Sequence, residues 1–565
     1  MMPGGLGGGT GGDDARATPG PYASAIQDFS LEDELRNLAA SPGGSLNAAA
    51  ICCDQHAHDE RKVALRYRNA GGEVREWTFA ALKLQSERLA RLLASLGVRK
   101  GDCVAGLLPR TPELLITALA TWRLGAVYQT LFTGFGPKAI EYRQREARTK
   151  VIVTDPANRA KIGDELDVLV LNTDPAGGDH DFWQDAPAAA GDLQPVACTL
   201  DDPILTMFTS GTTGLPKSLH IPVRAIAAFK RYMLDGIGLT AGDRYWNLAD
   251  PGWGYGIYYA VIGPLALGYA TTFHDGPFTV ADTYATIDAF GITNLAGSPT
   301  AYRMMIGAGA GPAAPLRGKL RAVSSAGEPL NPEVIRWFAE HLGATVLDHY
   351  GQTELGMVLC NHHGLSHPIR IGSAGFASPG LLVTVLADGL REAGPDEQGM
   401  LALDRTRSPF MWFTGYLGRE TTAFVGDWYL TGDTCERNAD GSISFVGRAD
   451  DVITTSGYRV GPFDVESALL EHPAVLESAV IGKPDAERTE IIKAFIVLNA
   501  GHRPDPALVE ELQCHVRSRL SKHAFPREVA FVPSLPKTPS GKVQRFLLRN
   551  REIAETPPHA EAARD

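Results

Sequence analysis

The chain has 565 residues, a formal net charge of −12 and a hydrophobic content of 44%. This length is enough for two or more domains, and this composition is typical of an ordinary globular protein. A diffuse negative charge repels phosphate backbones, which argues against nucleic acid as the main partner.

The cysteines and the N-terminus point to the reducing interior of a cell. Seven cysteines without a CxxC pair predict neither a disulfide framework nor a zinc ribbon. The glycine-rich N-terminus lacks an apolar signal core, and the apolar stretch 257–273 falls short of the ~20 residues that a membrane span needs. We therefore expect a cytoplasmic protein that begins with a disordered arm over residues 1–25.

From residue 62 onward, apolar strand-like runs alternate with amphipathic helical ones. Helical spacing of leucines predicts helices over 79–98 and 113–126. Short apolar runs predict strands at 62–68, 103–109, 150–155 and 167–172. Such alternation favours a parallel α/β architecture, which we assign to an N-terminal domain over 26–449.

The pattern changes near residue 450. Predicted strands at 477–485, 490–498 and 528–535 mix with predicted helices at 463–472 and 508–523. The segment 450–550 has the size of a small α+β domain. Residues 551–565 are expected to form a disordered tail.

The stretch "TMFTSGTTGLPKS" (206–218) is the first that carries chemistry. Its glycines let backbone N–H groups turn toward an anion, and its hydroxyls add donors, so it could hold an oligophosphate. It is not a Walker P-loop, because Pro216 precedes Lys217 where that pattern needs glycine. Taken alone, such a loop also fits an exposed surface turn.

Three further stretches add complementary groups. In "DHYGQTELG" (348–356) a tyrosine could face a planar ligand and Glu354 could hold a magnesium ion. In "YLTGDT" (429–434) and "GRADDVITTSGYR" (447–459), Asp433 could accept two ribose hydroxyls, with arginines as donors. In "LPKTPSGKVQR" (535–545) a turn presents Lys542 to an anionic centre. Each of these also fits a solvated loop when taken singly.

In this order, the stretches resemble the signatures of the adenylate-forming superfamily, which includes acyl-CoA synthetases, peptide-synthetase adenylation domains and luciferases. The likeness runs from about Phe29 to Arg549. "YGQTE", "GRADDVITTSGYRVGPFDVESAL" and "FPREVAFVPSLPKTPSGKVQR" carry a finer likeness to the medium-chain acyl-CoA synthetases, with acetyl-CoA synthetase more distant. The resemblance implies a large N-terminal α/β domain and a small, mobile α+β C-terminal domain.

The resemblance also implies a two-step reaction. A carboxylate and ATP give acyl-AMP and pyrophosphate, and the CoA thiol then gives a thioester and AMP. The implied cofactors and cosubstrates are therefore ATP, Mg²⁺ and CoA, and the implied partner is a small carboxylic acid.

Carried over position by position, the resemblance assigns most motif residues to ATP or AMP. The implied nucleotide contacts are Thr209, Ser210, Gly211, Thr212, Thr213, Gly214 and Lys217 at the phosphates, Gly327, Glu328, Pro329, Asp348, His349, Tyr350, Gly351 and Gln352 around the adenine, and Asp433 and Arg448 at the ribose. Thr353 would bind at the α-phosphate, and Glu354 with Thr209 would hold the metal. Lys542 would bridge the attacking carboxylate and the α-phosphate, which both carry negative charge.

Thioester formation implies a second pose of the C-terminal domain. The hinge of the family matches Asp450, and Gly457 would admit the pantetheine arm of CoA. Arg459 would contact the phosphate in that pose, while Lys542 moves out.

The implied acyl pocket is lined by Trp253, Gly254, Tyr255, Ala326 and Gly351. Gly351 stands where acetyl-CoA synthetase has a tryptophan, so we expect a tunnel for a chain longer than acetate. Gly254 and Ala326 widen the wall, whereas Tyr255 is larger than its counterpart. We expect a short-to-medium acyl chain, with branched or aromatic acids as alternatives.

Other interpretations stay open. The rivals are a ligase that loads a carrier protein and a catalytically silent acyl- or nucleotide-binding protein; we expect a free-standing synthetase because no carrier-type serine segment is recognisable. "CNHHGLSH" (360–367) is interpreted as a surface loop rather than a metal site, and Trp412 and Phe413 as core. Lys542 is a candidate for acetylation by a lysine acetyltransferase, reversed by a deacetylase, and a homo-oligomer is a further candidate.

Overall fold

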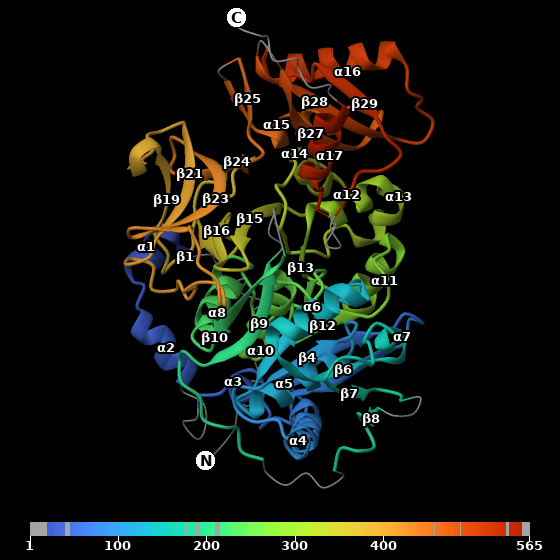
Figure 1. Ribbon diagram of the computed structural model, residues 1–565, viewed down its shortest axis with the longest axis vertical. Coiled ribbons are helices and arrows are strands. Elements are labelled where there is room, and N and C mark those ends of the chain that lie inside the picture. The colour runs from blue at the N-terminus through green and yellow to red at the C-terminus, as the bar shows by residue number, and fades with distance from the viewer. Residues whose placement is uncertain are drawn as a thin grey trace, which may run out of the picture.

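The computed structural model describes residues 20–39, 46–175, 179–187, 193–209, 215–456, 458–485, 488–521, 523–537 and 542–555. Figure 1 shows a large body below, coloured blue to orange, and a smaller unit in red above it. This confirms the predicted fold class, a large N-terminal α/β part followed by a smaller C-terminal one. The exact domain boundaries stay a prediction.

The first sheet has the strand order β10-β9-β5-β4-β6-β7-β8, with β9 and β10 antiparallel and the other neighbours parallel. Its strands are β4 (Cys103–Leu107), β5 (Val127–Thr130), β6 (Thr149–Thr154), β7 (Leu169–Asn172), β8 (His180–Asp181), β9 (Pro203–Thr209) and β10 (Lys217–Pro222). Its helices are α4 (Phe79–Ser95), α5 (Pro112–Arg123), α6 (Pro137–Ala147) and α7 (Pro156–Arg159). The predicted alternation of this region is therefore confirmed.

Local chemistry accounts for these helices. Helix α4 begins after Thr78, whose hydroxyl accepts the N–H of Ala81 at 3.1 Å, and it buries Leu82, Leu89 and Leu93 on one face. Helix α5 begins at Pro112, whose missing N–H costs nothing at the first helical position.

The second sheet has the order β11-β13-β14-β15-β16-β18, parallel from β11 to β15 and antiparallel beyond. Its strands are β11 (Tyr245–Asn247), β13 (Asn294–Gly297), β14 (Ala322–Ala326), β15 (Val346–Gln352), β16 (Gly356–Cys360) and β18 (Phe376–Ala377). Nearby helices are α8 (Ala225–Asp235), α9 (Gly254–Gly256), η2 (Ile257–Ile262), α10 (Gly263–Ala266), α11 (Val280–Phe290), α12 (Pro299–Gly307), α13 (Ala310–Ala313), η3 (Ala314–Leu316), α14 (Pro332–Trp337) and η4 (Phe338–Leu342). Parallel strands end at one edge, so the ends of β14 and β15 lie side by side there.

Two smaller sheets complete the large body. One consists of β12 (Thr271–His274), β2 (Val63–Arg68) and β3 (Val74–Thr78). The other is antiparallel and consists of β19 (Val383–Ala387), β20 (Arg391–Glu392), β21 (Glu397–Asp404), β22 (Phe424–Val425), β23 (Trp428–Arg437) and β24 (Ile443–Arg448), with η5 (Asp388–Leu390). Strands β23 and β24 carry Asp433 and Arg448 as a cross-strand pair.

The C-terminal unit has its own sheet and its own core. Its elements are β25 (Ile453–Thr455), β26 (Tyr458–Val460), β27 (Val475–Asp485), β28 (Thr489–Leu498), β29 (Glu528–Phe531), α15 (Pro462–Leu470), α16 (Pro506–Arg519) and α17 (Arg545–Glu555). A cluster of buried side chains drawn from residues 453–516 fills the space between α15, α16 and the sheet. The predicted mixture of strands and helices in this segment is confirmed.

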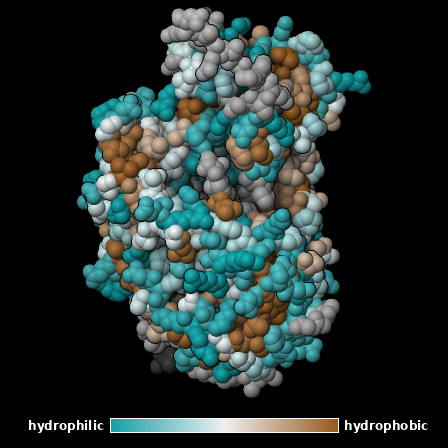
Figure 2. All heavy atoms as spheres, viewed as in Figure 1, coloured by the Kyte–Doolittle hydropathy of each residue, from teal (hydrophilic) through white to brown (hydrophobic). Residues whose placement is uncertain are grey.

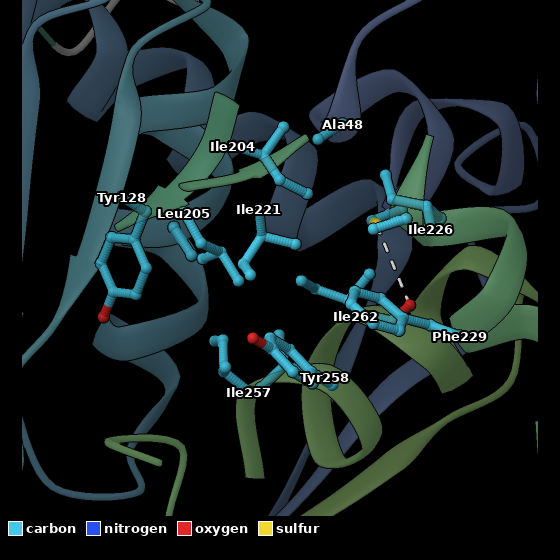
Figure 3. Close-up of a cluster of buried hydrophobic side chains, with 14 of the residues drawn as sticks. Ala48, Tyr128, Ile204, Leu205, Ile221, Ile226, Phe229, Ile257, Tyr258 and Ile262 are labelled. Carbon is cyan, nitrogen blue, oxygen red and sulfur yellow. Dashed lines mark hydrogen bonds between the residues drawn. The ribbon is translucent and has the colours of Figure 1, made fainter. Parts of the chain in front are cut away.

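The largest core lies beneath the junction of the two main sheets, and Figure 3 shows part of it. Side chains of β9, β10, α8 and η2 meet there; those labelled include Ile204, Leu205, Ile221, Ile226, Phe229, Ile257, Tyr258 and Ile262. Phe229 stacks on Tyr258 with centroids 4.5 Å apart, and the Tyr258 hydroxyl donates to the carbonyl of Thr353 at 2.9 Å. The core thus supports the segment that follows β15.

The two chain ends differ from expectation where they are described. Residues 20–25 belong to β1 (Gly20–Pro21) and α1 (Tyr22–Gln27), followed by α2 (Leu31–Ala39), α3 (Ala48–Cys52) and η1 (Asp54–His56). Tyr22 anchors this segment, because its hydroxyl donates to the carbonyl of Ala377 at 2.8 Å and β1 pairs with β17 (Leu365–Ser366). Residues 551–555 continue α17. Residues 1–19 and 556–565 lie outside the described part of the chain.

Within the described residues, no helix is long and apolar enough to cross a membrane. All seven cysteines are unpaired. Figure 2 shows a face dominated by hydrophilic residues, on which hydrophobic ones form separate patches.

Candidate functional site

The glycine-rich stretch lies in the chain between β9, which ends at Thr209, and β10, which begins at Lys217. Thr209 and Lys217 close the antiparallel pair and face each other in register. Residues Ser210, Gly211, Thr212, Thr213 and Gly214 lie outside the described residues, so their predicted phosphate contacts stay a prediction.

Tyr416 joins three of the predicted phosphate and metal residues. Its hydroxyl donates to Oε1 of Glu354 at 2.7 Å, and Nζ of Lys217 lies 4.9 Å from its ring centroid. Burial and Glu354 raise the pKa of Tyr416, and the Thr209 hydroxyl is close enough to bond to it and partly oppose that rise. Residues from β9, β10 and the turn after β15 are therefore gathered around one aromatic ring.

A second group surrounds Asp433, which is 4% exposed. Tyr350 and Gln352 both donate to Oδ2 of Asp433, Gln352 at 2.9 Å. Arg448 reaches Oδ1 at 3.4 Å and Asp450 at 3.5 Å. The predicted adenine and ribose residues on β15, β23 and β24 thus form one connected polar network.

Electrostatics distinguish the two carboxylates from ordinary surface acids. Burial raises the pKa of Asp433, opposed by Arg448, by the Tyr350 and Gln352 hydrogen bonds and by Lys542. Burial likewise raises the pKa of Glu354, opposed by the Tyr416 hydrogen bond. Perturbed carboxylates that face an open edge of a sheet are typical of binding and catalytic sites.

Lys542 is exposed and lies on the C-terminal unit, just before α17. Its ammonium is near enough to Asp433 to lower the pKa of that carboxyl. The C-terminal unit therefore holds Lys542 near Asp433, and the predicted role of Lys542 in the first pose stays a prediction.

The side chain of His349 lies apart from those of the other residues of β15 that were predicted to frame the adenine. Asp348, Tyr350 and Gln352 lie on one face of β15, whereas His349 lies on the other, because side chains alternate along a strand. His349 is buried, with Nδ1 2.7 Å from the Tyr232 hydroxyl and Nε2 3.1 Å from the carbonyl of Asn361. Its ring therefore does not line the adenine side with its neighbours.

Glu328 is also engaged elsewhere. Its carboxylate accepts from the Thr300 hydroxyl at 2.8 and 2.9 Å and from Arg303 at 3.0 Å. Gly327, by contrast, has φ +96° and open space where a Cβ would lie, so its backbone is accessible to a ligand. Pro329, partly exposed, follows directly, and burial raises the pKa of half-buried Asp348.

The structure does not show the expected tunnel in the direction in which a side chain at position 351 would point. A Cβ built on Gly351 would lie 2.1 Å from the carbonyl oxygen of Gly356, so the backbone of β16 fills the space that a side chain would take. The pairing of β15 with β16 shifts register between Tyr350 and Gly351, which explains this close approach.

The other predicted pocket residues are packed against partners. A Cβ on Gly254 would lie 3.3 Å from Oγ1 of Thr353, so this glycine allows the two segments to meet. Trp253 packs on Phe132, with centroids 5.4 Å apart, and the Tyr255 hydroxyl lies 3.3 Å from that of Tyr232.

A small cavity lies next to these packed residues. The end of β14 is also close to the site. The cavity is lined by Ala228, Tyr232, Tyr259, Leu355, Met357 and Trp412, among others. Met357 is the residue paired with Gly351 across the two strands. Ala326 is buried at the end of β14, beside His349.

Three further predictions concern the second pose. Asp450, the predicted hinge, is half exposed and pairs with Arg448. Arg459 is exposed on β26, within the C-terminal unit. Gly457 lies outside the described residues. The roles of all three in thioester formation stay predictions.

The histidine stretch is less exposed than the predicted surface loop, because Cys360 and His362 are 0% and 3% exposed, whereas the aromatic pair is buried as predicted. No cluster of three or more potential metal-binding side chains exists among the described residues. His362 and His367 instead pack around Tyr22 at centroid distances of 5.6 and 5.9 Å. Trp412 and Phe413 are 3% and 4% exposed, as expected for core.

Sequence reasoning missed Tyr416 and Tyr232. Tyr416 lies in an irregular segment between β21 and β22 that has no charge run or glycine pattern to single it out. The adjacent Gly415, with φ +133°, was the available signal of a constrained turn. Tyr232 lies on α8 among apolar residues, so it was indistinguishable from core.

Comparisons with known proteins agree with this geometry. The family model described as "AMP-binding enzyme" matches residues 53–417, and its C-terminal domain model matches residues 464–542. An acetyl-coenzyme A synthetase of Bacillus subtilis is 37% identical over 94% of this chain and 95% of its own length. The human mitochondrial acyl-coenzyme A synthetase ACSM4 is 35% identical, over 90% of this chain and 91% of its own.

A solved structure points the same way. The crystal structure of a Brucella canis acyl-CoA synthetase shares 52% identity, with a TM-score of 0.76, over 95% of this chain and 99% of that one. The chain therefore belongs to the AMP-binding enzyme family, and it is an AMP-forming acid–thiol ligase of the acyl-CoA synthetase kind.

Proposed function

We propose that this acyl-CoA synthetase activates a short-to-medium-chain carboxylic acid, with branched and aromatic acids as candidates, and that acetate is a poor substrate. The acid reacts with ATP to give acyl-AMP and pyrophosphate, and CoA then takes the acyl group with release of AMP. The observation that supports the acyl-AMP step is that Lys542, on the C-terminal unit, lies near enough to Asp433 to lower the pKa of that carboxyl, while Gln352 donates to the same carboxylate.

In this proposal, the charge of each residue matches the part of the substrates that it contacts. Thr209 and Lys217 bind the β- and γ-phosphates beside Tyr416, while Asp433 accepts the ribose hydroxyls and Arg448 donates to them. Lys542 neutralises charge between the incoming carboxylate and the α-phosphate as their oxygen and phosphorus atoms approach. No general base is required, because a carboxylate is already ionised at neutral pH.

The same site suits a magnesium ion bound mainly through the nucleotide. Glu354 is buried and uses one oxygen for Tyr416, and Mg²⁺ is often held by one carboxylate together with substrate phosphates. Glu354 and Thr209 would hold the ion, which would neutralise phosphate charge.

The substrate proposal rests on the cavity behind β15 and β16. The cavity is small as it stands, Met357 in its lining pairs with Gly351 across the strands, and the lining is apolar apart from Ser378 and the Arg231–Asp235 ion pair. A flexible methionine can move aside for an alkyl chain. Each methylene buried there would contribute about 0.8 kcal/mol to binding, which acetate cannot gain.

The test is pyrophosphate release with ATP and Mg²⁺ across acetate, butyrate, isobutyrate, hexanoate, octanoate and benzoate, with and without CoA. Sustained turnover only with CoA, and a maximum beyond acetate, is the expected result. A maximum at acetate would contradict the proposed substrate class, and would show that Tyr255 and Met357 keep the pocket short.

Two rivals predict different patterns. A ligase that loads a carrier protein would form acyl-AMP from acid and ATP but would gain no turnover from CoA. A silent binding protein would release no pyrophosphate with any acid.

A further inference from the structure

We propose that Asn331 is a positioning residue that docks the C-terminal unit in the pose for acyl-AMP formation, through its hydrogen bond to Ser467. This inference rests on the proposed two-step function. It concerns the contact between α14, in the large body, and α15, in the C-terminal unit, which adjoin in Figure 1.

Asn331 occupies the N-cap of α14 but does not cap it. Asparagine at this position usually accepts a backbone N–H of the first turn, yet the side chain here makes no such bond. Its Nδ2 donates to the Ser467 hydroxyl at 2.9 Å, and its Oδ1 accepts from Arg303 at 3.1 Å. The side chain is therefore committed to contacts outside its own helix.

The neighbours fix the direction of the amide. A guanidinium can only donate, so Arg303 must face Oδ1, and Nδ2 is then left for Ser467. Arg303 is itself held by Glu328 at 3.0 Å and by the Thr300 hydroxyl at 2.8 Å. With 4% of its surface exposed, Asn331 has little freedom to turn away.

This arrangement links the nucleotide side to the pose of the C-terminal unit. Glu328 follows Gly327, whose open backbone faces the ligand side, and the chain of bonds then runs from Glu328 through Arg303 and Asn331 to Ser467. A nucleotide that orders residues 327–328 would also order the docking contact.

A second contact between α14 and α15 is weaker, because it is exposed to solvent. Arg336 on α14 lies 3.3 Å from Glu471 at the end of α15, but 62% of the Arg336 side chain is exposed. Glu471 is also shared with Arg519 at 3.4 Å. Exposed ion pairs contribute little, so this pair is a matched control for the Asn331 contact.

The strength of the contact suits a joint that must open in each cycle. A neutral hydrogen bond changes an equilibrium by about two- to tenfold, enough to favour one pose without locking it. Loss of the Asn331–Ser467 hydrogen bond should slow acyl-AMP formation, which needs Lys542 in the site. It should not slow thioester formation, for which Lys542 moves out.

The test measures the two half-reactions separately in Ser467→Ala. We expect single-turnover pyrophosphate release without CoA to slow about two- to tenfold. Thioester formation from supplied acyl-AMP and CoA should stay unchanged or rise. Ser467→Thr, which keeps the hydroxyl, should restore acyl-AMP formation, and Arg336→Ala should change neither rate.

Other outcomes overturn the proposal. An unchanged ratio of the two rates in Ser467→Ala would contradict it, and so would an equal loss of both rates, which indicates a merely structural role. A wild-type protein that releases no pyrophosphate with any acid contradicts the proposed function instead. Tryptic cleavage after Arg448 then tests the contact alone: faster cleavage in Ser467→Ala supports docking, and equal cleavage refutes it.

Discussion

The two sides of the candidate site are held in different ways. On the side of the large body, Asp433 is buried and bonded to Tyr350, Gln352 and Arg448 at once. On the side of the C-terminal unit, Lys542 is exposed. In the proposed mechanism, the groups that bind ATP are thus fixed by overlapping bonds, whereas Lys542 arrives on a unit that would move away after the first step. This difference is what a protein needs if one acyl carbonyl must meet first ATP and then CoA.

The largest effect on the reaction rate is expected when Lys542, on the C-terminal unit, loses its positive charge. Lys542→Ala should slow acyl-AMP formation about 10²- to 10³-fold, because one fixed cation at a developing anionic centre is worth that much. Thioester formation from supplied acyl-AMP should continue. Quenched-flow measurement of acyl-AMP formation and of thioester formation tests this. An equal loss of both rates would contradict it, because Lys542 would then act in both steps.

A change on the fixed side should weaken nucleotide binding instead. Asp433→Asn removes a charged acceptor and should raise the KM for ATP roughly tenfold or more. In the wild type, burial raises the pKa of Asp433, so protonation and the rise in KM should set in at a higher pH than for an exposed aspartate.

Asp433→Asn separates the titration of Asp433 from that of other groups. The KM of this variant for ATP should not rise toward acidic pH when the variant and the wild type are both measured from pH 5 to pH 8. An identical pH profile in the two proteins would assign the titration to another group.

The acyl side can be altered without touching either charge. Met357→Trp should fill the cavity behind β16 and lower kcat/KM for octanoate roughly tenfold relative to butyrate, since the far methylenes lose their burial. Met357→Leu is the control of similar volume and should keep the wild-type order. A preference unchanged by the tryptophan would locate the acyl chain elsewhere.

The smallest effect is expected at Tyr416. Tyr416→Phe keeps the ring beside Lys217 but removes the hydrogen bond that lowers the pKa of Glu354. The pKa of Glu354 should rise further, so the loss should be about threefold at pH 8 and larger at pH 6, where more of the carboxyl is protonated. Initial rates at the two pH values test this, and a loss independent of pH would mean that the hydroxyl acts on another group.

Sequence patterns predicted the parts of the site that are local. The alternation of strands and helices and the strand before the glycine-rich stretch follow from residue type and spacing, whereas the roles of the residues around Asp433 stay predictions. His349 was predicted to frame the adenine with Asp348 and Tyr350, but the alternation of β15 puts its side chain on the opposite face from theirs.

Features that depend on distant segments could not be predicted. The space beside Gly351 is closed by Gly356, through a register shift that no local pattern encodes. Tyr416 reaches Glu354 from 62 residues away, and Asn331 meets Ser467 only because two units dock in one pose.

The most direct test of a movable C-terminal unit is to stop it from moving. In a Cys514→Ser background, which removes an exposed thiol, Asn331→Cys and Ser467→Cys can be joined by a short bifunctional thiol reagent. The cross-linked protein should form about one equivalent of acyl-AMP and pyrophosphate and then stop before the thioester, while the untreated double variant continues to turn over. Continued thioester formation by the cross-linked protein at the untreated rate would contradict the account.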